Sequence, residues 1–411
     1  MIPALKVVGG SYGEECAFPR RRILRGSGSR AATLLSSMGV KTTLHTTVYP
    51  HQLQQARSLA LHLGYEIQSV DSGQLIWFRY RFPLGRPDIY PSQIARIDQP
   101  EVNAECALVY GMVEGRPRVT AKKAVYDPQD GSNSRCFSDN GSVADVLAQV
   151  VSLSEGRALT GFAEPTEIAE ALLGQSGTTV AIVKCGPQGS LVATGDERAW
   201  VCSFPTRNVY KIGSGDVFSA AFAYSWICMN QDPVLAAWFA SRCVAHYVEH
   251  GVDRLNVELL QSFADEAKTA YMRHGSGMCR VIPQGHIYLA GPFFSVSQQW
   301  VIDETRGALL DMGFNVFSPI HDIGEGLAND ITSADLKALD RSQIVLAILD
   351  GLDSGTLFEV GYARAKGIPV VAVAEDVPPR MLTMIEGSGC DVVQDLTTAI
   401  YRTCWSLMGD V

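Results

Sequence analysis

The sequence predicts two α/β domains, each built on a mainly parallel sheet. Short apolar runs alternate with amphipathic stretches along the whole chain, which is the pattern of repeated βα units. The length of 411 residues suits two or three domains. Gly, Ser and Pro punctuate residues 273–285, between a long helical stretch and a new strand pattern. We therefore divide the chain into a domain of residues 1–277 and a domain of residues 283–411.

Strands and helices are predicted from the spacing of the apolar residues. Short apolar runs predict strands at residues 4–8, 42–47, 107–110, 181–184, 287–290, 344–349 and 370–374. Helical spacing predicts helices at residues 30–38, 54–63, 217–228 and 301–312. Residues 74–80 (QLIWFRY) have strand character and precede the Pro- and Gly-rich FPLGRPDIYP. That segment predicts either a β-ribbon over a pocket mouth or a plain edge hairpin.

The composition is that of a globular protein, with 46% hydrophobic and 19% charged residues. The net charge of -9 argues against a nucleic-acid polymer as partner, because surfaces that bind phosphate backbones are usually basic. Ten cysteines are scattered without CxxC or Cys/His metal spacing, which predicts reduced thiols in a cytoplasmic protein and no metal site. The amino-terminal residues resemble a strand, and no apolar run approaches about 18 residues, so no membrane segment is expected.

Three features of the second domain point to a ligand site. The strand at residues 287–289 runs into the small-residue turn Ala290-Gly291-Pro292-Phe293, where backbone amides are able to approach a ligand. An ordinary βα turn is the alternative. Asp335 lies in SADLKAL, which predicts a helix before the strand at residues 344–349. Its carboxylate is expected to point towards the carboxyl ends of the strands, and a helix cap or a solvated acid is the alternative.

The third feature is DGLDSGTLFEVGYA at residues 350–363, a Gly- and Asp-rich loop that opens into a helix. Helix N-termini hold anions. Glu359 lies among apolar neighbours, where a carboxylate is costly unless it has a partner or a function. A Glu on the solvated stripe of the helix is the alternative.

These motifs together resemble the nucleoside 2-deoxyribosyltransferase family, which includes 2'-deoxynucleoside 5'-monophosphate N-glycosidases. The resemblance rests on YLAGPFF, AILDG, GTLFEVGYA and KGIPVVAV, in order, and spans residues 285–411. It implies that Glu359 attacks the anomeric carbon, as in a retaining glycosidase. It implies that Asp335 handles the departing base. A family Asp that often precedes the strand is replaced by Gln343, which cannot act as an acid.

The resemblance also suggests which groups contact the substrate. The turn residues Ala290, Gly291, Pro292 and Phe293 are expected to bind it. Contacts to the sugar or the base are expected from the loop residues Asp350, Gly351 and Asp353. Donors to a 5'-hydroxyl or 5'-phosphate are expected from the helix start, which comprises Ser354, Gly355 and Thr356. If the acceptor is another base the enzyme is a transferase, and if it is water the enzyme is a hydrolase.

The clearest motif of the first domain is VYKIGSGDVF at residues 209–218. Gly213, Ser214 and Gly215 would present amides at a helix N-terminus, an arrangement that stabilises charge on a transferring phosphoryl group. Asp216 is positioned to accept a hydroxyl proton as general base. A Gly-rich strand–helix turn with an Asp cap is the alternative.

The motif resembles the GAGD signature of the PfkB, or ribokinase, family of sugar and nucleoside kinases. RGSGSRAATLLSSMG and VKCGPQG agree in order, and the aromatic ribbon at residues 74–80 occurs where the family has its substrate lid. The resemblance covers roughly residues 4–272. The family usually has Asp-Thr before GAGD, where this chain has Tyr210 and Lys211. The family NxxE motif appears as SEGR, in which only Glu155 offers a carboxylate.

Further departures affect the expected acceptor site. The family Asn of the first motif is replaced near Ser29 and Arg30, and only Glu14 or Glu15 is available for the substrate-binding Asp. Two interpretations therefore stand. Either Asp216 supports phosphoryl transfer, or the kinase fold is kept for ligand binding or assembly.

The two resemblances imply a ribokinase-like three-layer domain with a β lid and a flavodoxin-like, doubly wound parallel-sheet domain. The expected function is cleavage or transfer at the N-glycosidic bond of a (deoxy)nucleoside or its 5'-monophosphate. The kinase-like domain would phosphorylate or bind a nucleoside or sugar. ATP and Mg²⁺ are implied for that domain, and no cofactor is implied for the other. A homo-oligomer with small-molecule substrates is expected. The alternatives are a kinase with a nucleotide-binding regulatory domain, and a non-catalytic nucleotide sensor.

Overall fold

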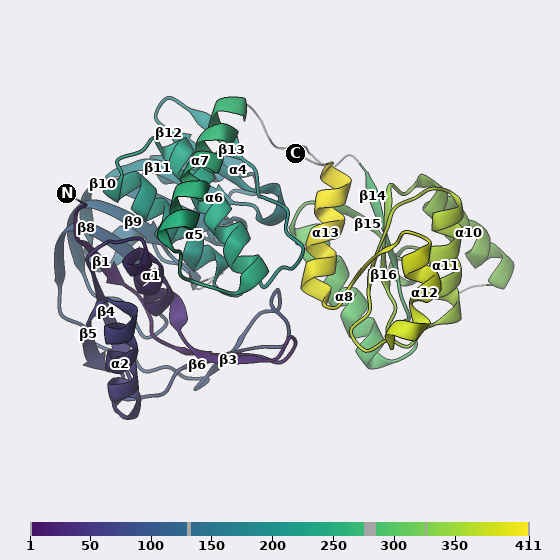
Figure 1. Ribbon diagram of the computed structural model, residues 1–411, viewed down its shortest axis with the longest axis horizontal. Helices are drawn as coiled ribbons and strands as arrows, with labels where there is room; N and C mark the ends of the chain where they lie inside the picture. The colour runs from purple at the N-terminus through teal and green to yellow at the C-terminus, as the bar shows by residue number, and fades with distance from the viewer. Residues whose placement is uncertain (1, 130–132, 275–284, 325–326, 410–411) are drawn as a thin grey trace. The chain divides into compact units, whose positions relative to one another are not determined.

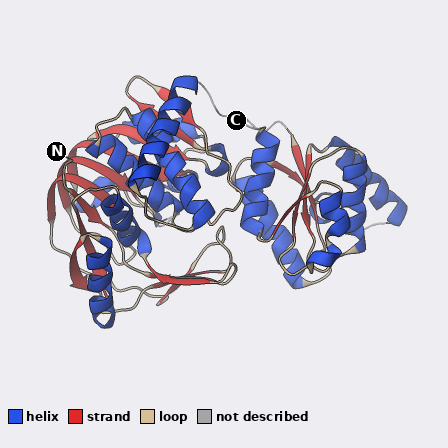
Figure 2. Cartoon of the chain, in the orientation of Figure 1, coloured by secondary structure: helices blue, strands red, loops and turns tan. Residues whose placement is uncertain are grey.

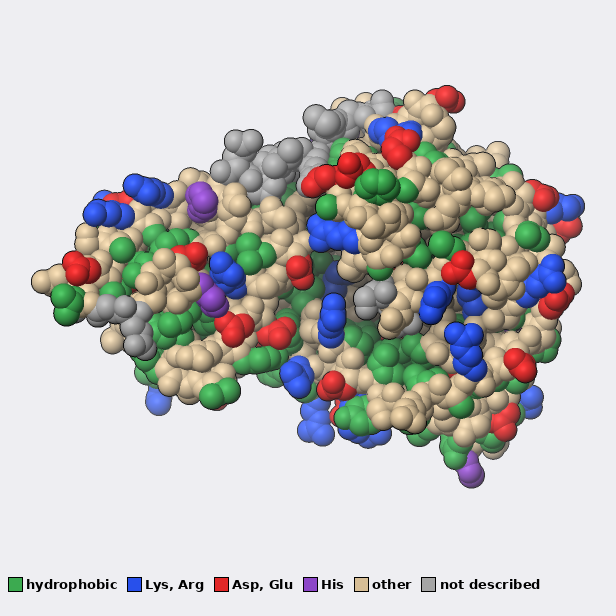
Figure 3. Space-filling model, turned by 180° about the vertical axis from the view of Figure 1, so that it is seen from behind, with side chains coloured by type: hydrophobic (Ala, Val, Ile, Leu, Met, Phe, Trp, Pro, Cys, Tyr) green, Lys and Arg blue, Asp and Glu red, His purple; other side chains and the backbone are tan. Residues whose placement is uncertain are grey.

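The computed structural model describes residues 2–129, 133–274, 285–324 and 327–409. Internal contacts divide the chain into two units. The N-terminal unit takes the residues up to 280, except Phe82–Gly85 and Pro205–Val209, which group with the C-terminal unit. Both units are α/β structures, as the sequence predicts (Figures 1 and 2). Acidic and basic side chains are interspersed on the visible surface (Figure 3).

The main sheet of the N-terminal unit has nine strands in the order β13-β12-β11-β10-β9-β8-β1-β4-β5. All neighbours are parallel except the β11–β12 and β12–β13 pairs. Its strands are β1 (Leu5–Val8), β4 (Thr42–Val48), β5 (Glu66–Asp71), β8 (Val102–Tyr110), β9 (Val119–Asp127), β10 (Val143–Ser152), β11 (Thr178–Lys184), β12 (Ser190–Thr194) and β13 (Arg198–Val201).

A second sheet of four strands has the order β3-β2-β6-β7. Its strands are β2 (Gly13–Cys16), β3 (Arg21–Leu24), β6 (Trp77–Tyr80) and β7 (Asp88–Tyr90). The strand expected at residues 74–80 is present as β6, which begins only at Trp77. It pairs within this separate sheet and does not lie at an edge of the main sheet. This small sheet is the β lid.

The helices of the N-terminal unit form the outer two layers of a three-layer structure (Figure 1). One face of the main sheet packs against α1 and α5, and the other packs against α3 and α4 near β10 and β11. The helices are α1 (Gly26–Ser37), η1 (Pro50–Gln52), α2 (Leu53–Leu63), η3 (Phe137–Asn140), α3 (Leu153–Thr160), α4 (Pro165–Leu173), η4 (Gly186–Gln188), α5 (Ser214–Ala223), the π-helix η5 (Tyr224–Cys228), α6 (Pro233–His250) and α7 (Val257–His274).

Among the described residues, two connections between parallel strands of the main sheet show no α-helix. Residues 111–118 alone join β8 to β9, and residues 128–142, which include the short η3, join β9 to β10. Parallel neighbours usually need a crossover of about a dozen or more residues, most often a helix. The sheet face there is covered by loops and by Phe137, whose ring packs near Tyr126.

The C-terminal unit has a fully parallel sheet of five strands in the order β15-β14-β16-β17-β18. In chain order this is 2-1-3-4-5, the flavodoxin-like doubly wound arrangement. Its strands are β14 (His286–Ala290), β15 (Asn315–Phe317), β16 (Ile344–Ile348), β17 (Val370–Val373) and β18 (Asp391–Val393). The strands expected at residues 287–290, 344–349 and 370–374 are confirmed.

Helices cover both faces of this sheet (Figure 1). Ile302 of α8 and Ile400 of α13 pack on one face, and Leu339 of α10, Val360 of α11 and Ile385 of α12 pack on the other. The helices are α8 (Val296–Asp311), α9 (Pro319–Asp322), α10 (Ala328–Arg341), α11 (Ser354–Ala365), η6 (Pro379–Met381), α12 (Thr383–Gly387) and α13 (Leu396–Met408). Within the described residues, no helix has the length and apolar character to span a membrane. The described cysteines are free thiols, mostly buried.

Candidate functional site

The predicted site residues of the C-terminal unit gather where β14 and β16 end. These two strands are neighbours in the sheet, and the chain leaves β14 towards β15 on one side and β16 towards β17 on the other. In open parallel sheets, this reversal of strand order opens a crevice at the carboxyl ends, and ligands bind there. The turn after β14 and the loop before α11 both lie at this edge.

Glu359 lies in the second turn of α11, whose start is fixed by a side-chain cap. Asp353 accepts hydrogen bonds from the Thr356 amide (2.8 Å) and from the Thr356 hydroxyl (3.1 Å). A capping side chain holds the first turn of a helix at a defined residue. Val360 and Ala363 of α11 are buried against the sheet. This packing fixes the direction in which the neighbouring Glu359 points.

The Tyr288 hydroxyl donates a hydrogen bond of 2.7 Å to Oε1 of Glu359. Tyr288 lies on β14 and is fully buried. Burial raises the pKa of the Glu359 carboxyl to about 7, the hydrogen bond from Tyr288 partly opposes this rise, and the charges of Asp335 and Asp353 add to it. Burial and the charge of Glu359 raise the pKa of the Tyr288 hydroxyl, which keeps its proton and remains the donor.

Asp335 of α10 faces the same tyrosine. Burial raises the pKa of the Asp335 carboxyl, and the nearby Tyr288 hydroxyl offsets part of the rise. Its Oδ1 is buried and has no hydrogen-bond partner in the part of the chain that the structure describes. The structure therefore brings Asp335 and Glu359 together around one hydroxyl, with an acceptor oxygen on Asp335 left for another group.

The turn after β14 approaches the sheet closely. At Gly291, an added Cβ would lie 2.8 Å from the Ile302 side chain and 3.0 Å from that of Ile348, so the position has no room for a larger residue. Ala290 and Pro292 are buried, and Phe293 is partly exposed. The Phe293 ring lies 4.9 Å from that of Phe294, measured between centroids.

The loop before α11 contains carboxylates with local partners. Asp350 accepts hydrogen bonds from the amides of Glu375 (3.2 Å) and Asp376 (2.7 Å), which ties this loop to the residues after β17. Gly351 is in the left-handed region, with φ of 90°. Asp353 and Thr356 are engaged in the helix cap described above. Among the predicted phosphate-end donors, Ser354 and Gly355 are exposed at the helix start.

Gln343 lies at the amino end of β16, opposite the crevice. Its side-chain oxygen accepts a hydrogen bond from the His286 amide, and its side-chain nitrogen donates one to the Arg341 carbonyl at 3.0 Å. The first of these hydrogen bonds connects the amino end of β14 to that of β16. The replacement of an acid at this position is therefore remote from Glu359 and Asp335.

Tyr288 is a site residue that the sequence analysis missed. It occurs in the YLAGPFF motif, but its buried strand position resembles that of a core residue. The available signal is chemical, because a tyrosine hydroxyl inside a core needs a hydrogen-bond partner. Here that partner is Glu359, 71 positions later in the chain.

The predicted site of the N-terminal unit lies at the start of α5. Gly213 precedes this helix with φ of 83°, a conformation that favours glycine. Ser214 and Asp216 are buried in the first turn. The Tyr110 hydroxyl donates a hydrogen bond of 2.7 Å to the Asp216 carbonyl, and so fixes the helix start to the end of β8. The predicted glycine turn and Asp216 therefore do lie together at a helix N-terminus.

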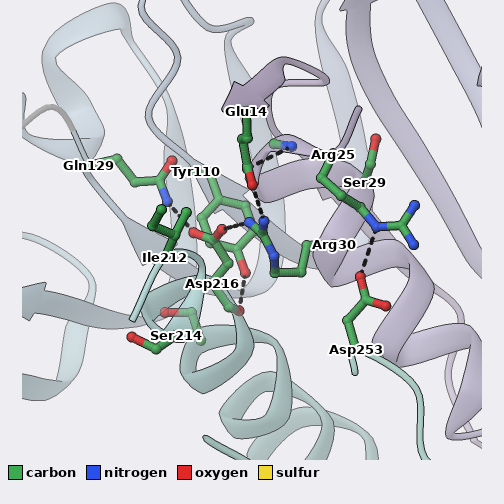
Figure 4. A network of polar contacts seen from close by, with 12 residues as sticks. Glu14, Arg25, Ser29, Arg30, Tyr110, Gln129, Ile212, Ser214, Asp216 and Asp253 are labelled. Atoms are coloured by element: carbon green, nitrogen blue, oxygen red, sulfur yellow. Dashed lines mark hydrogen bonds and ion pairs between the residues drawn. The ribbon is translucent and has the colours of Figure 1, made fainter. Parts of the chain in front are cut away.

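Both carboxylate oxygens of Asp216 already have partners (Figure 4). Arg30 donates to Oδ2, and Gln129 donates to Oδ1 at 2.6 Å. Arg30 is 2% exposed and also donates to Glu14 of the lid sheet. An added Cβ on Gly213 would lie 2.3 Å from the Arg30 guanidinium carbon, so the guanidinium rests on the glycine turn. Burial raises the pKa of Asp216 to about 6, and Arg30 opposes this.

Two lysines flank the same turn. Lys211 donates a hydrogen bond of 2.8 Å to the Ser214 hydroxyl, and Lys184 at the end of β11 pairs with Asp127 at 2.8 Å. Burial and the charge of Lys184 lower the pKa of Lys211 to about 8. Glu155 caps α3 through the Ser152 amide, and burial raises its pKa.

These residues fit only part of what a bound nucleoside triphosphate requires. Lys184 and Lys211 beside a glycine turn suit phosphate oxygens. Asp216 does not suit the role of a free base, since Arg30 and Gln129 hold both its oxygens. Among the described residues, no group of three or more His, Cys, Asp or Glu side chains is arranged to hold a metal ion.

Comparisons with known proteins confirm both resemblances. Residues 287–393 match the family model of nucleoside 2-deoxyribosyltransferase, and residues 122–257 match that of the pfkB family carbohydrate kinases. The first match includes Tyr288, Asp335 and Glu359, and the second includes Asp216. No curated protein matches the chain.

Solved structures similar to the chain include kinases. A phosphofructokinase-2 from Escherichia coli, in complex with substrates and products, has 11% identity and a TM-score of 0.49, over 64% of this chain and 99% of that one. A ribokinase from Thermotoga maritima has 16% identity and a TM-score of 0.47, over 64% of this chain and 99% of that one. A pyrophosphate-dependent kinase in the ribokinase family, complexed with a pyrophosphate analog and myo-inositol, has 16% identity and a TM-score of 0.45. This similarity covers 62% of this chain and 99% of that one.

Proposed function

We propose that the C-terminal unit cleaves or transfers at the N-glycosidic bond of a (deoxy)nucleoside or its 5'-monophosphate, with Glu359 as nucleophile. The observation that carries the proposal is the 2.7 Å hydrogen bond from Tyr288 to Glu359 at the crevice between β14 and β16. The match of residues 287–393 to the deoxyribosyltransferase family supports the substrate class.

In the first step, a carboxylate oxygen of Glu359 bonds to the anomeric carbon while the bond from that carbon to the base nitrogen breaks. The base leaves with the electron pair of the broken bond. Asp335 is suited to protonate it, because a half-buried carboxyl with a raised pKa holds its proton longer than an exposed one. The Tyr288 hydroxyl orients the Glu359 oxygen that it contacts.

In the second step, an acceptor attacks the anomeric carbon and releases Glu359 as a carboxylate. Asp335, left ionised by the first step, takes the proton of the acceptor. Water as acceptor gives a free sugar or sugar phosphate, and a second base gives a new nucleoside. Both outcomes use the same two carboxyl groups, so their geometry supports either.

The start of α11 is suited to the 5' end of the substrate. Ser354 and Gly355 are exposed in the first turn of a helix whose amino end carries partial positive charge. A 5'-hydroxyl or a 5'-phosphate is therefore favoured there, and phosphate gains more from the helix charge. Glu359 lies on the same helix, so one element positions both ends of the sugar.

For the N-terminal unit, we propose ligand binding without phosphoryl transfer by Asp216. A general base needs a free oxygen directed at the hydroxyl it deprotonates. Arg30 and Gln129 occupy both oxygens of Asp216, and Arg30 covers the glycine turn. Lys184 and Lys211 support binding of an anion beside that turn.

A base-release assay tests both proposals. The full chain is incubated with nucleosides and their 5'-monophosphates, with and without ATP and Mg²⁺, and the bases and phosphates are resolved. We expect base release that does not depend on ATP and that is lost in Glu359→Ala. The matched variant Glu386→Ala, at an exposed position of α12, should keep the activity. An intact principal activity in Glu359→Ala would contradict the proposal, and a phosphorylated product would contradict the assignment of the N-terminal unit.

A further inference from the structure

A cavity of about 1020 Å³ opens on the N-terminal unit, and its lining includes none of the candidate site residues described above. Its walls come from residues 96–99, from residues 111–118 between β8 and β9, from Tyr126 of β9, and from Pro128, Asn133, Arg135, Asp139 and Asn140 after β9. The segments between β8 and β9 and after β9 belong to the two connections that show no α-helix among the described residues. The volume slightly exceeds the upper limit of the usual range for small-molecule sites, about 300–1,000 Å³.

Four arginines line this cavity: Arg96, Arg116, Arg118 and Arg135. Arg118 is engaged, since it donates to the Gly141 carbonyl at 2.9 Å and pairs with Glu101 at 3.3 Å. Arg96 and Arg135 are exposed, and within the described residues neither guanidinium forms an ion pair. Two cations at the cavity are therefore available to a ligand.

Arg116 is held rigidly in the cavity wall. Its Nη2 donates to the carbonyls of Cys136 (2.6 Å) and Phe137 (2.7 Å), and its guanidinium lies 4.7 Å from the Tyr126 ring centroid. Its Nη1 is buried and has no hydrogen-bond partner in the described parts of the chain. The charge of Asp139 acts on Arg116, but the two form no ion pair among the described residues. A guanidinium with an unused donor is complementary to an anion.

Two of the carboxylates at the cavity accept hydrogen bonds from other groups of the protein. Three carboxylates line the cavity, Asp98, Glu114 and Asp139. Glu114 is fully buried and accepts hydrogen bonds of 2.5 Å from both the Tyr12 and Thr47 hydroxyls. Asp139 accepts a hydrogen bond of 2.9 Å from the Cys136 amide. Asp98 and Asp139 are exposed, and the three arginines Arg96, Arg116 and Arg135 outnumber them in the open part of the cavity.

We propose that this cavity binds a phosphate monoester of nucleotide size, with Arg96, Arg116 and Arg135 on its phosphate. Ile97 and Met112 line the same cavity and are only partly buried, so they offer an apolar surface to a base. The bidentate geometry of guanidinium matches phosphate oxygens better than that of an ammonium group does. The site is separate from Glu359 and does not depend on the function proposed for it.

Calorimetric titration with AMP, adenosine, ribose 5-phosphate and inorganic phosphate tests the site. Full-length Glu359→Ala protein serves as host, so that turnover does not disturb the titration. AMP should show a binding component that adenosine lacks. In the double variant Arg96→Ala/Arg135→Ala, this component should weaken about tenfold or more, because hydrogen bonds to charged groups are lost. Arg57→Ala changes an exposed arginine of α2 outside the cavity and should leave it unchanged.

Arg116→Lys provides a second variant that keeps the charge but loses the planar fork, and it should weaken AMP binding as well. An AMP component with unaltered affinity in both arginine variants would overturn the proposal. Inorganic phosphate that binds as tightly as AMP would overturn the nucleotide size of the ligand. Any AMP binding at the crevice beside residue 359 should not respond to these variants. Absence of base release by the wild-type protein would contradict the proposed function of the C-terminal unit, and it would not affect the conclusion about AMP binding in this cavity.

Discussion

Tyr288 and Glu359 are joined by a 2.7 Å hydrogen bond between β14 and α11, in which the buried phenol donates to the carboxylate. The contact links the first strand of the C-terminal sheet to the helix that follows its third strand. Burial favours the protonated carboxyl, while the phenol favours the ionised one. The ionised form of Glu359, which the proposed reaction requires, is therefore favoured by this one hydroxyl group against the effect of burial.

Tyr288→Phe should slow base release about 10- to 100-fold, because a hydrogen bond to a charged group contributes about 1.5–3 kcal/mol. Its pH profile should also move, since loss of the hydrogen bond raises the pKa of Glu359 further. The measurement is kcat/KM against pH. Tyr362→Phe is the matched control: Tyr362 lies on α11 as Glu359 does, but its hydroxyl donates at 3.0 Å to exposed Asp340 of α10. A slow variant with an unmoved profile would argue for a purely structural tyrosine.

The rate of the wild-type protein should rise with pH through about 7. In the proposed reaction Glu359 attacks as a carboxylate, so its pKa of about 7 should set the ascending limb of kcat/KM. An exposed Glu would be fully ionised well below that pH. Initial rates from pH 5 to 9 check this. A flat profile between pH 5 and 7 would show that Glu359 is ionised throughout and that its surroundings do not raise its pKa.

Glu359→Gln should be inactive yet more stable than the wild type at pH 8. The pKa of Glu359 is higher in the folded state than in the unfolded state. The contribution of this carboxyl group to the free energy of unfolding is therefore fully present below about pH 4.5 and is lost as pH rises through about 7. A neutral amide avoids the cost of the buried charge at pH 8, on the order of 1–3 kcal/mol. Unfolding temperatures at pH 5 and pH 8 give the measurement. An equal rise in the unfolding temperature at pH 5 and pH 8 would assign the effect to packing instead of to the buried charge.

Asp335→Asn should lower kcat about 10²- to 10⁴-fold, the usual contribution of a general acid. The loss should be larger for bases that are poor leaving groups, because these need protonation most. Asp330→Asn, at an exposed position of the same helix, is the control. Rates across a series of bases provide the readout. A uniform loss for all bases would indicate that Asp335 positions the substrate instead.

Arg30→Ala should destabilise the N-terminal unit by about 3–5 kcal/mol, because it leaves Glu14 and Asp216 as buried carboxylates without their shared cation. Arg22→Ala removes an exposed pair with Glu15, separated by 4.0 Å, and should cost less than about 1 kcal/mol. Urea unfolding followed by tryptophan fluorescence measures both. A small effect at Arg30 would mean that water readily replaces the guanidinium between the two acids.

Much of the fold follows from local pattern. β14, β16 and β17 are short apolar runs, and their residues pack on both faces of a parallel sheet, which makes such strands conspicuous. Glu359 was also accessible to sequence reasoning, since a carboxylate among apolar residues stands out. Local pattern cannot pair Tyr288 with Glu359, because the contact joins elements that only the sheet order brings together.

The N-terminal site shows the same limit. The glycine turn and Asp216 are evident in the sequence, and so is the replacement near Arg30. That Arg30 reaches across to hold both Glu14 and Asp216 depends on the packing of α1 against α5 and on the lid sheet. The cavity was not predicted, since an absent helix between β8 and β9 leaves no motif to find.

The short link between β8 and β9 also bears on how the chain folds. Val102 pairs with Val119, a separation far smaller than that of β1 and β8, whose Lys6 pairs with Ala107. Loop-closure entropy grows with the number of residues enclosed, so the β8–β9 pair is the cheaper of the two to close. Parallel sheets usually fold slowly because their contacts are distant in sequence. In this chain the centre of the main sheet is local in sequence, and we expect it to act as the nucleus onto which the amino-terminal strands add.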